Sequence, residues 1–310
     1  MEDRQIEQSI VKTIVFFDMF DYPLTAVEVF KWLDGTASSL KQIDLLLSSS
    51  EYIKERVTSS NGFYFLSGRD EIVSTRLDRF LTGHNKFKII NRGIRLIKSL
   101  PFVRFIGLAN SIGSNNIRQG SDIDLLVVTK SGRLYLTRFL VTAILNLFRL
   151  RRHDGRIIDR LCLSFYITDD NLNLSKIKSA TSDHYLSYWL ANLTPVYDRH
   201  CYSKILSSNH QLLSRFKNFS QLGFGRVIVD GWFNRLVYQT SEFFLEGWFG
   251  SGLEWIFSKI QILKMSYNNK SLARCDDTRV VINNKMLKFH ENDRRQYYND
   301  SYDRLVFKII

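Results

Sequence analysis

The chain contains only three cysteines, Cys162, Cys201 and Cys275, and they lie far apart in its 310 residues. No two of them are spaced like the paired ligands of a zinc knuckle, so the sequence excludes that class of metal site. The low cysteine content also fits a reducing compartment, where disulfides are rare. The opening residues MEDRQIEQSI lack the apolar core of a signal peptide and carry acids where it would carry bases. We therefore expect a cytoplasmic protein.

Long apolar runs are absent as well. The best candidate for a membrane segment is FLVTAILNLF at residues 139–148, which is far shorter than the ~20 residues that a span requires. Arginines flank it closely, with Arg138 before it and Arg149 after it. We expect this segment to form the buried face of a helix, and we expect no membrane partner.

The composition is that of a globular protein. Hydrophobic residues make up 45% of the chain and aromatic residues 14%, which argues against disorder. The length allows two or three domains with a sizeable core. The net charge is +12, but residues 1–100 hold 14 Lys or Arg and 13 Asp or Glu, so the basic excess lies in residues 101–310. Nucleic-acid binding by the first hundred residues therefore has little electrostatic support.

The first hundred residues predict a small domain and a connection. Residues 1–68 have the pattern of three helices and a hairpin at Asn61-Gly62, with Thr25 and Glu28 placed as a capping box. Three helices followed by a hairpin indicate a winged-helix-like domain. Residues 69–100 predict one or two connecting helices that carry many basic side chains.

The remaining residues divide at about position 175. Residues 101–175 alternate strand, helix and strand, which indicates an α/β core. Residues 176–310 predict a mainly helical region with one hairpin at residues 280–289. Four tryptophans are scattered through this last region, and we expect them in its core because large aromatic side chains carry much of core burial. They are Trp189, Trp232, Trp248 and Trp255.

Two aspartates open a strongly apolar strand within NSIGSNNIRQGSDIDLLVV at residues 110–128. Residues two apart in a strand project to the same face, so Asp122 and Asp124 should point together while Ile123 and Leu125 point to the other side. Two neighbouring carboxylates repel, and burying them is costly unless a cation joins them. A hard divalent ion such as Mg²⁺ suits oxygen ligands. The alternative is a solvated pair in a loop, which is common.

The segment before the aspartates is small and polar. Ser111 stands eleven positions before Asp122, at the end of a predicted strand. A serine at a strand-to-helix turn, with free backbone N–H groups behind it, can hold phosphate oxygens. Such a turn beside a metal-binding carboxylate pair suits a nucleoside triphosphate.

Ser111, the eleven-residue step and the SDIDLLVV strand resemble the polymerase-beta-like nucleotidyltransferase superfamily. The wider arrangement resembles an uncharacterised branch that has an N-terminal winged-helix-like segment. The resemblance implies a nucleotidyltransferase core in residues 101–175, with Ser111 and the turn at Asn110 binding the triphosphate and Asp122 and Asp124 holding Mg²⁺. It also implies transfer of a nucleoside monophosphate from an NTP to a small molecule, a protein or an RNA end, with release of pyrophosphate.

The chain departs from that family at Asn110, where the family has glycine. Asparagine is one of the few other residues that tolerate a left-handed backbone, although its side chain could obstruct the nucleotide. Members of the family carry a third carboxylate as base, and Asp159 is the candidate here. The alternative for Asp159 is a strand-start charge paired with Arg156 or Arg160.

Other features admit two interpretations each. The basic cluster at residues 149–156 could bind substrate phosphates. Alternatively, its positive charges could simply be stabilised by the helix dipole at a helix C-terminus. His290 and Asp293, in the sequence FHEND, precede the last predicted helix and are expected to be structural. Cys162 alternates into a strand and is expected to be a buried apolar residue.

Two rival functions remain open at this point. A catalytically degenerate member would bind nucleotide or a protein partner, and Asn110 favours it. A nucleic-acid-binding regulator would use the winged helix, but its third helix offers Lys41 and then almost only acids, serines and leucines. Phosphate contacts from Lys and Arg dominate DNA affinity, so we do not expect duplex DNA to be a partner.

Overall fold

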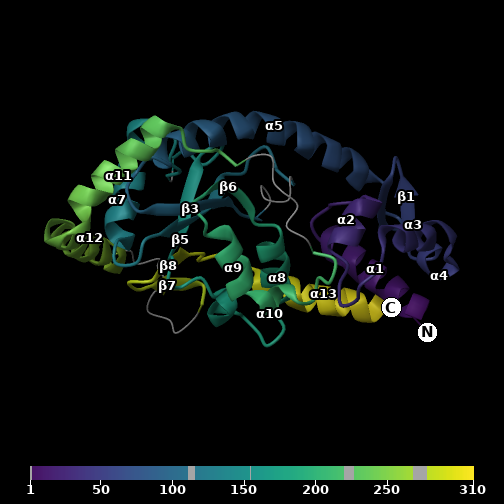
Figure 1. Cartoon of the computed structure of the whole chain (residues 1–310). Helices are drawn as coiled ribbons and strands as arrows, with labels where there is room; N and C mark the ends of the chain where they lie inside the picture. The colour runs from purple at the N-terminus through teal and green to yellow at the C-terminus, as the bar shows by residue number, and fades with distance from the viewer. Residues whose placement is uncertain (1, 111–115, 154, 220–226, 268–277) are drawn as a thin grey trace.

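A six-stranded mixed sheet lies at the centre of the computed structural model, which describes residues 2–110, 116–153, 155–219, 227–267 and 278–310 (Figure 1). The strand order is β6-β3-β4-β5-β8-β7. Strands β4 and β5 run parallel, and the other neighbouring pairs are antiparallel. The strands are β3 (Val103–Leu108), β4 (Ile123–Thr129), β5 (Leu161–Thr168), β6 (Thr194–Asp198), β7 (Val280–Ile282) and β8 (Met286–Phe289). The α/β class expected for the core is confirmed.

Helix α7 (Leu134–Leu147) joins β4 to β5 as the crossover that two parallel strands need. Its apolar residues recur at helical spacing, and one face of it is buried. Val141 and Leu145 are inaccessible to solvent, whereas Leu147 at the far end is 75% exposed. The expectation that residues 139–148 belong to a helix with a buried face is therefore confirmed.

The sheet separates two apolar cores. Alternate residues of β4 belong to different cores, with Leu125 and Val127 on one side and Leu126 and Val128 on the other. Helices α5 (Glu71–Ile97) and α7 cover the first side, as Figure 1 shows along the top and left of the molecule. The second side is covered by short helices and by the last helix of the chain. These are α8 (His184–Ala191), α9 (Tyr202–Ser208), α10 (His210–Leu213) and α13 (Arg295–Ile309), with the 3-10 turn η1 (Leu174–Ile177) beside them.

The N-terminal segment follows the predicted order of helices and hairpin. It consists of α1 (Glu2–Asp18), α2 (Ala26–Lys31), α3 (Leu40–Ser49), α4 (Glu51–Lys54), β1 (Val57–Ser60) and β2 (Phe63–Leu66). The capping box between Thr25 and Glu28 is present, and Asn61 and Gly62 both have positive φ in the hairpin turn. The hairpin and the first two helices are thus confirmed, whereas the third predicted helix is divided at Ser50, which caps the end of α3 and the start of α4. The winged-helix assignment itself stays a prediction.

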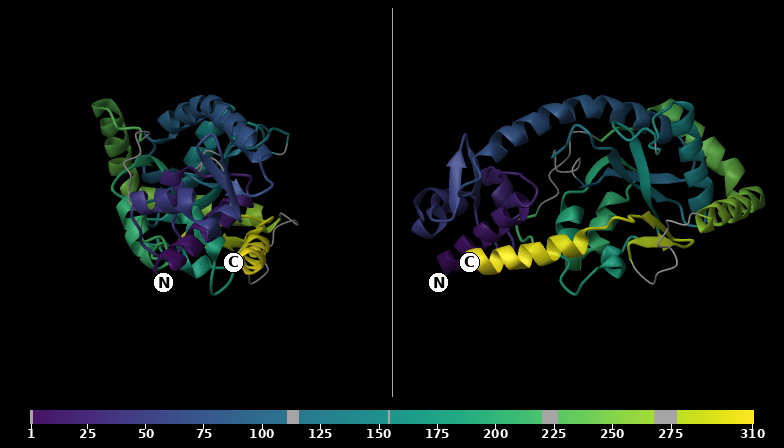
Figure 2. Two further views of the ribbon diagram at one scale, coloured as in Figure 1. Left: turned by 90° about the vertical axis from the view of Figure 1, so that its right-hand side faces the viewer. Right: turned by 180° about the vertical axis from the view of Figure 1, so that it is seen from behind.

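Residues 1–68 share their core with the C-terminal region. Phe16 of α1 stacks on Tyr188 of α8 with ring centroids 3.6 Å apart. Tyr302 of α13 donates from its hydroxyl to the Asp34 carboxylate over 2.9 Å. Figure 2 shows α13 running beneath the N-terminal helices, so that both chain ends lie at the same end of the molecule. The sheet likewise takes strands from both sides of residue 175, since β6, β7 and β8 complete it.

The expectation for the tryptophans is correct for Trp189 and wrong for the other three. Trp189 is buried, whereas Trp232, Trp248 and Trp255 are exposed on helices α11 (Trp232–Glu246) and α12 (Trp248–Ser266). No side chain of α11 is buried at all. The physical reason is that these helices turn their polar sides, not their apolar sides, toward the rest of the chain.

Candidate functional site

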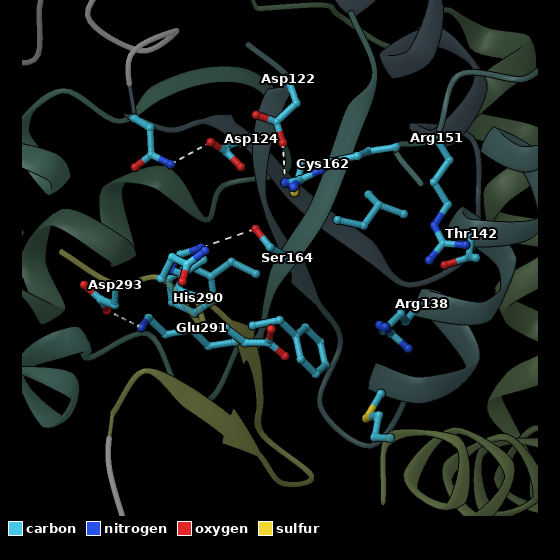
Figure 3. Close-up of a pocket in the computed structure, with 18 of the residues that line it drawn as sticks. Asp122, Asp124, Arg138, Thr142, Arg151, Cys162, Ser164, His290, Glu291 and Asp293 are labelled. Carbon is cyan, nitrogen blue, oxygen red and sulfur yellow. Dashed lines mark hydrogen bonds and ion pairs between the residues drawn. The ribbon is translucent and has the colours of Figure 1, made fainter. Parts of the chain in front are cut away.

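An open pocket of about 1210 Å³ lies at the N-terminal ends of β4 and β5 (Figure 3). It is bounded by α7, α8, α12 and the segment between β8 and α13. Asp122 and Asp124 line it, as do Asn110, Cys162 and His290. Asp122 immediately precedes β4 and Asp124 is the second residue of that strand. Ile123 and Leu125 are buried in the core on the opposite face. The predicted alternation is therefore confirmed, and it places both carboxylates at the pocket wall.

Cys162 of β5 joins the two aspartates. It is the register partner of Asp124, and ligand atoms of Asp122, Asp124 and Cys162 lie within 4.8 Å of one another. The expectation that Cys162 is buried is confirmed, but its proximity to the carboxylates was not foreseen. Burial raises the pKa of the Cys162 thiol to about 12, with the Asp124 carboxylate adding to the shift, so the thiol is protonated at neutral pH.

The donor set fits a hard cation through its oxygens. Carboxylates are the ligands that Mg²⁺ takes in proteins, whereas a thiolate favours softer ions. Because the Cys162 proton is held tightly, the two aspartates are the residues able to hold Mg²⁺ here. Burial and the repulsion from Asp122 raise the pKa of Asp124, so a cation beside it would offset part of the cost of ionising this carboxyl.

Arg152 is the cation nearest to these groups. Its Nη1 lies 2.6 Å from Oδ2 of Asp122 and 3.5 Å from the sulfur of Cys162. Arg152 belongs to the basic segment that the sequence offered either as phosphate ligands or as a helix end. Arg151 lines the pocket beside it. At least these two side chains therefore belong to the site, and Arg152 neutralises one of its carboxylates.

Asn110 connects Asp124 to helix α8. Its backbone is left-handed with φ of 54°, as its place in the turn predicted. Its Nδ2 donates to Oδ2 of Asp124 over 2.7 Å, and its Oδ1 accepts from Nε1 of Trp189 over 2.8 Å. The side chain is thus hydrogen-bonded on both sides, and it holds the half-buried carboxylate in place. This double hydrogen bond is what glycine at the same position would lack.

Ser111 lies outside the described residues, so the structure places Asn110 but not the serine that follows it. Asp159 is described, and it does not line the pocket. Its carboxylate lies 2.9 Å from Nζ of the buried Lys86. One of its two interpretations was a strand-start charge paired with Arg156 or Arg160; the charge is paired, but its partner is Lys86, which helix α5 brings to the start of β5. The pocket-facing residues of β5 nearest to Asp124 are Cys162 and Ser164, and neither is an acid.

The FHEND residues form another side of the pocket. Ser164 and Nε2 of His290 are 3.3 Å apart, and burial lowers the pKa of His290 to about 4, so the ring is neutral at neutral pH. Asp293 pairs with Lys288 at 3.0 Å and with Arg295 at 2.8 Å. The structural role expected for Asp293 fits this buried network. His290 lines the pocket as well, which its sequence position alone did not indicate.

Basic side chains from α7, from the segment after it and from α12 face the carboxylates across the pocket. Figure 3 shows Arg138 and Arg151 on the side away from Asp122 and Asp124. Arg138 Nη1 donates to Oε1 of Gln261 over 2.6 Å, while its Nε is buried without a hydrogen-bond partner among the described residues. Lys264 of α12 completes this basic wall. The pocket therefore has an acidic side and a basic side.

The chain matches no protein-family model, and neither the curated proteins nor the solved structures include one similar enough to count as a match.

Proposed function

We propose that the chain is an Mg²⁺-dependent nucleotidyltransferase that binds an NTP in this pocket. The observation that carries the proposal is the pair Asp122 and Asp124 on one face of β4, opposite a basic wall. Two carboxylates would hold the ion, and the guanidinium groups of Arg138 and Arg151 would bind phosphate oxygens.

Mg²⁺, when bound, neutralises the triphosphate and activates the attacking oxygen. The side chains around it keep that arrangement in place. Asn110 fixes Asp124 from one side, and Arg152 offers Asp122 a counter-charge until a ligand arrives. The transfer forms a bond from an acceptor oxygen to the α-phosphorus and breaks the bond to the bridging oxygen, which releases pyrophosphate. The acceptor would be a small molecule, a protein or an RNA end.

A second candidate is a member that binds nucleotide without catalysis. Two observations favour it: Arg152 and Asn110 already satisfy the two carboxylates, and β5 presents Cys162 and Ser164 where a third carboxylate would stand. Such a protein would retain the phosphate contacts and lack the base toward the acceptor.

Incubation of the protein with each α-labelled NTP, Mg²⁺ and a cell extract separates these functions. A transferase moves the label onto an acceptor and releases pyrophosphate, and the Asp122→Asn, Asp124→Asn double variant does neither. Binding of Mg²⁺ and NTP with no label transferred would favour the second candidate. Failure of every NTP to bind would contradict both.

A further inference from the structure

Helix α11 is attached to the body through its polar side. The Glu242 carboxylate lies 2.8 Å from Nη1 of Arg104 and accepts from the backbone N–H of Phe102 over 2.7 Å. The Arg199 guanidinium covers the ring of Tyr238 at 3.4 Å from its centroid. Asn234, Tyr238 and Glu242 recur every four residues, so they define one face of the helix. The opposite face is apolar, and it points away from the protein.

Helix α12 is attached in the same way. The Glu254 carboxylate accepts from the backbone N–H groups of Tyr135 and Leu136 at the start of α7, over 3.0 and 2.7 Å. Gln261 donates to the Tyr135 carbonyl over 2.8 Å. One aromatic pair, Phe257 stacked on Phe139 at 4.0 Å, supplements these polar contacts.

The outward faces of α11 and α12 together form an apolar ridge. Its members are exposed side chains, with Trp248 at 88% and Phe243 at 79%. They are Trp232, Phe233, Leu236, Val237, Phe243, Phe244, Trp248, Phe249, Trp255, Ile256, Ile260, Ile262 and Leu263. Figures 1 and 2 place these two helices at the end of the molecule that lies farthest from the N-terminal helices and both termini.

An uncovered ridge of this kind indicates a partner. Soluble proteins rarely expose apolar patches larger than a few hundred Å², and larger ones mark protein or membrane interfaces. The ridge holds thirteen of the large apolar side chains exposed on the described part of the chain, within only 32 residues. The polar contacts of Glu242 and Glu254 keep it turned outward rather than into a core.

The acidic and basic side chains of α11 and α12 differ in their contacts. The acids of residues 227–267 all bond to the body, whereas the three bases are exposed and form no ion pair with any described residue. The acids pair as Asp230 with Lys98, Glu242 with Arg104, Glu246 with Lys130 and Glu254 with the α7 amides. The exposed bases are Arg235 and Lys259 beside the ridge, and Lys264, which lines the pocket. The charges of α11 and α12 that form no ion pair with any described residue are therefore all positive.

We propose that the apolar ridge docks on the surface of an anionic lipid bilayer. Trp and Phe side chains favour the interfacial layer of a bilayer, and Lys and Arg beside them are attracted to anionic headgroups. No helix in the described part of the chain is long and apolar enough to cross a membrane, so α11 and α12 would lie in the interface. The sequence led us to expect no membrane partner because it lacks a span, and docking needs none.

A second copy of the chain fits the ridge less well. Each copy carries a net charge of +12, and ridge-to-ridge contact would bring Arg235 and Lys259 near the same residues of the other copy. Like charges brought together oppose association, whereas anionic headgroups complement them. The docking proposal does not depend on the proposed transferase activity, because its test needs no nucleotide.

Flotation of the full chain with lipid vesicles tests the proposal. We expect the protein to float with phosphatidylglycerol–phosphatidylcholine vesicles and to bind vesicles of phosphatidylcholine alone more weakly. The variant Trp232→Ser, Phe243→Ser, Trp248→Ser, Trp255→Ser should bind the anionic vesicles at least tenfold more weakly. All four side chains are exposed, so the fold should survive, and a thermal melt checks this.

Two further variants separate the causes. Arg235→Gln with Lys259→Gln should weaken binding to anionic vesicles roughly fivefold per charge removed, because each base near an anionic surface strengthens binding by about that factor. The control variant Leu77→Ser, Phe80→Ser, Leu81→Ser removes exposed apolar side chains of α5 instead, and it should leave vesicle binding unchanged. An equal loss of vesicle binding in this control variant would overturn the assignment of membrane binding to the ridge.

Tryptophan fluorescence gives an independent signal. Trp32 and Trp189 are buried, so the tryptophans that respond to lipid should be those of the ridge. Anionic vesicles should shift the emission to shorter wavelength, and acyl-brominated lipids should quench it. Absence of flotation and of any spectral change would overturn the proposal. A ridge-dependent dimer in sedimentation velocity, without vesicle binding, would overturn it in favour of a second copy.

Discussion

Asn110 donates its side-chain amide to Asp124 over 2.7 Å while its own backbone stands at φ of 54°. Asn110→Gly relieves backbone strain of about 1 kcal/mol. It also removes a hydrogen bond to a half-buried carboxylate, worth about 1.5–3 kcal/mol, and leaves Nε1 of Trp189 without its partner. We expect the free energy of unfolding to fall by about 1 kcal/mol in urea titrations.

Asn61→Gly is the matched control for that substitution. Asn61 has a similar φ of 52° in the β1–β2 turn, and it makes no side-chain hydrogen bond to any described residue. Its replacement relieves comparable strain and loses no partner, so stability should change little. A stabilised Asn110→Gly protein would show that the amide bridge to Asp124 contributes nothing.

Asp124→Asn should stabilise the metal-free protein at neutral pH. Burial, together with the charge of Asp122, raises the pKa of Asp124, so the folded state binds this proton more tightly than the unfolded chain does. That contribution to stability is full below the ordinary Asp pKa and is lost as the pH rises through the raised value. In EDTA, the gain in free energy of unfolding should be largest at neutral pH and should shrink as the pH falls. A difference in the free energy of unfolding that stays constant as the pH falls would contradict the raised pKa of Asp124.

Arg152→Gln should strengthen the binding of Mg²⁺ alone. Arg152 lies 2.6 Å from Asp122, and its charge opposes a second cation at the same carboxylates. Removing it should raise the Mg²⁺ affinity by about tenfold in a calorimetric titration without nucleotide. Weaker Mg²⁺ binding in the variant would mean that the arginine orders the site instead of competing for it.

Asp159→Asn should spare the nucleotide site and weaken the fold. Asp159 lies outside the pocket and supplies the counter-charge of the buried Lys86, whose Nζ also donates to the Gln119 carbonyl over 3.2 Å. We expect a loss of about 1–3 kcal/mol in the free energy of unfolding, with unchanged affinity for Mg²⁺ and NTP. Loss of nucleotide binding in a folded variant would restore Asp159 as a candidate third carboxylate.

Strand periodicity was sufficient to predict the shared face of Asp122 and Asp124, because the two-residue repeat is a local property. Cys162 could not be assigned to that face, since its register with Asp124 depends on pairing between strands 38 residues apart in sequence. A lone cysteine in an apolar strand has the same pattern whether it meets a core or a carboxylate.

Which face of α11 meets the protein could not be predicted either, again because contacts between residues far apart in sequence decide it. Helical periodicity separates its polar and apolar faces but does not say which of them meets the protein. The answer depends on Arg104 and Arg199, which hold Glu242 from positions far away in the sequence. The expectation that the tryptophans lie in a core used the usual rule, and these long-range ion pairs reverse it.

A calorimetric titration of NTP, with and without Mg²⁺, tests the central claim most directly. If Asp122 and Asp124 hold the ion, the wild type should bind NTP more tightly with Mg²⁺ present. The Asp122→Asn, Asp124→Asn double variant should lose that difference and remain folded. Equal NTP affinity with and without Mg²⁺, in wild type and variant alike, would contradict a metal site at these two carboxylates.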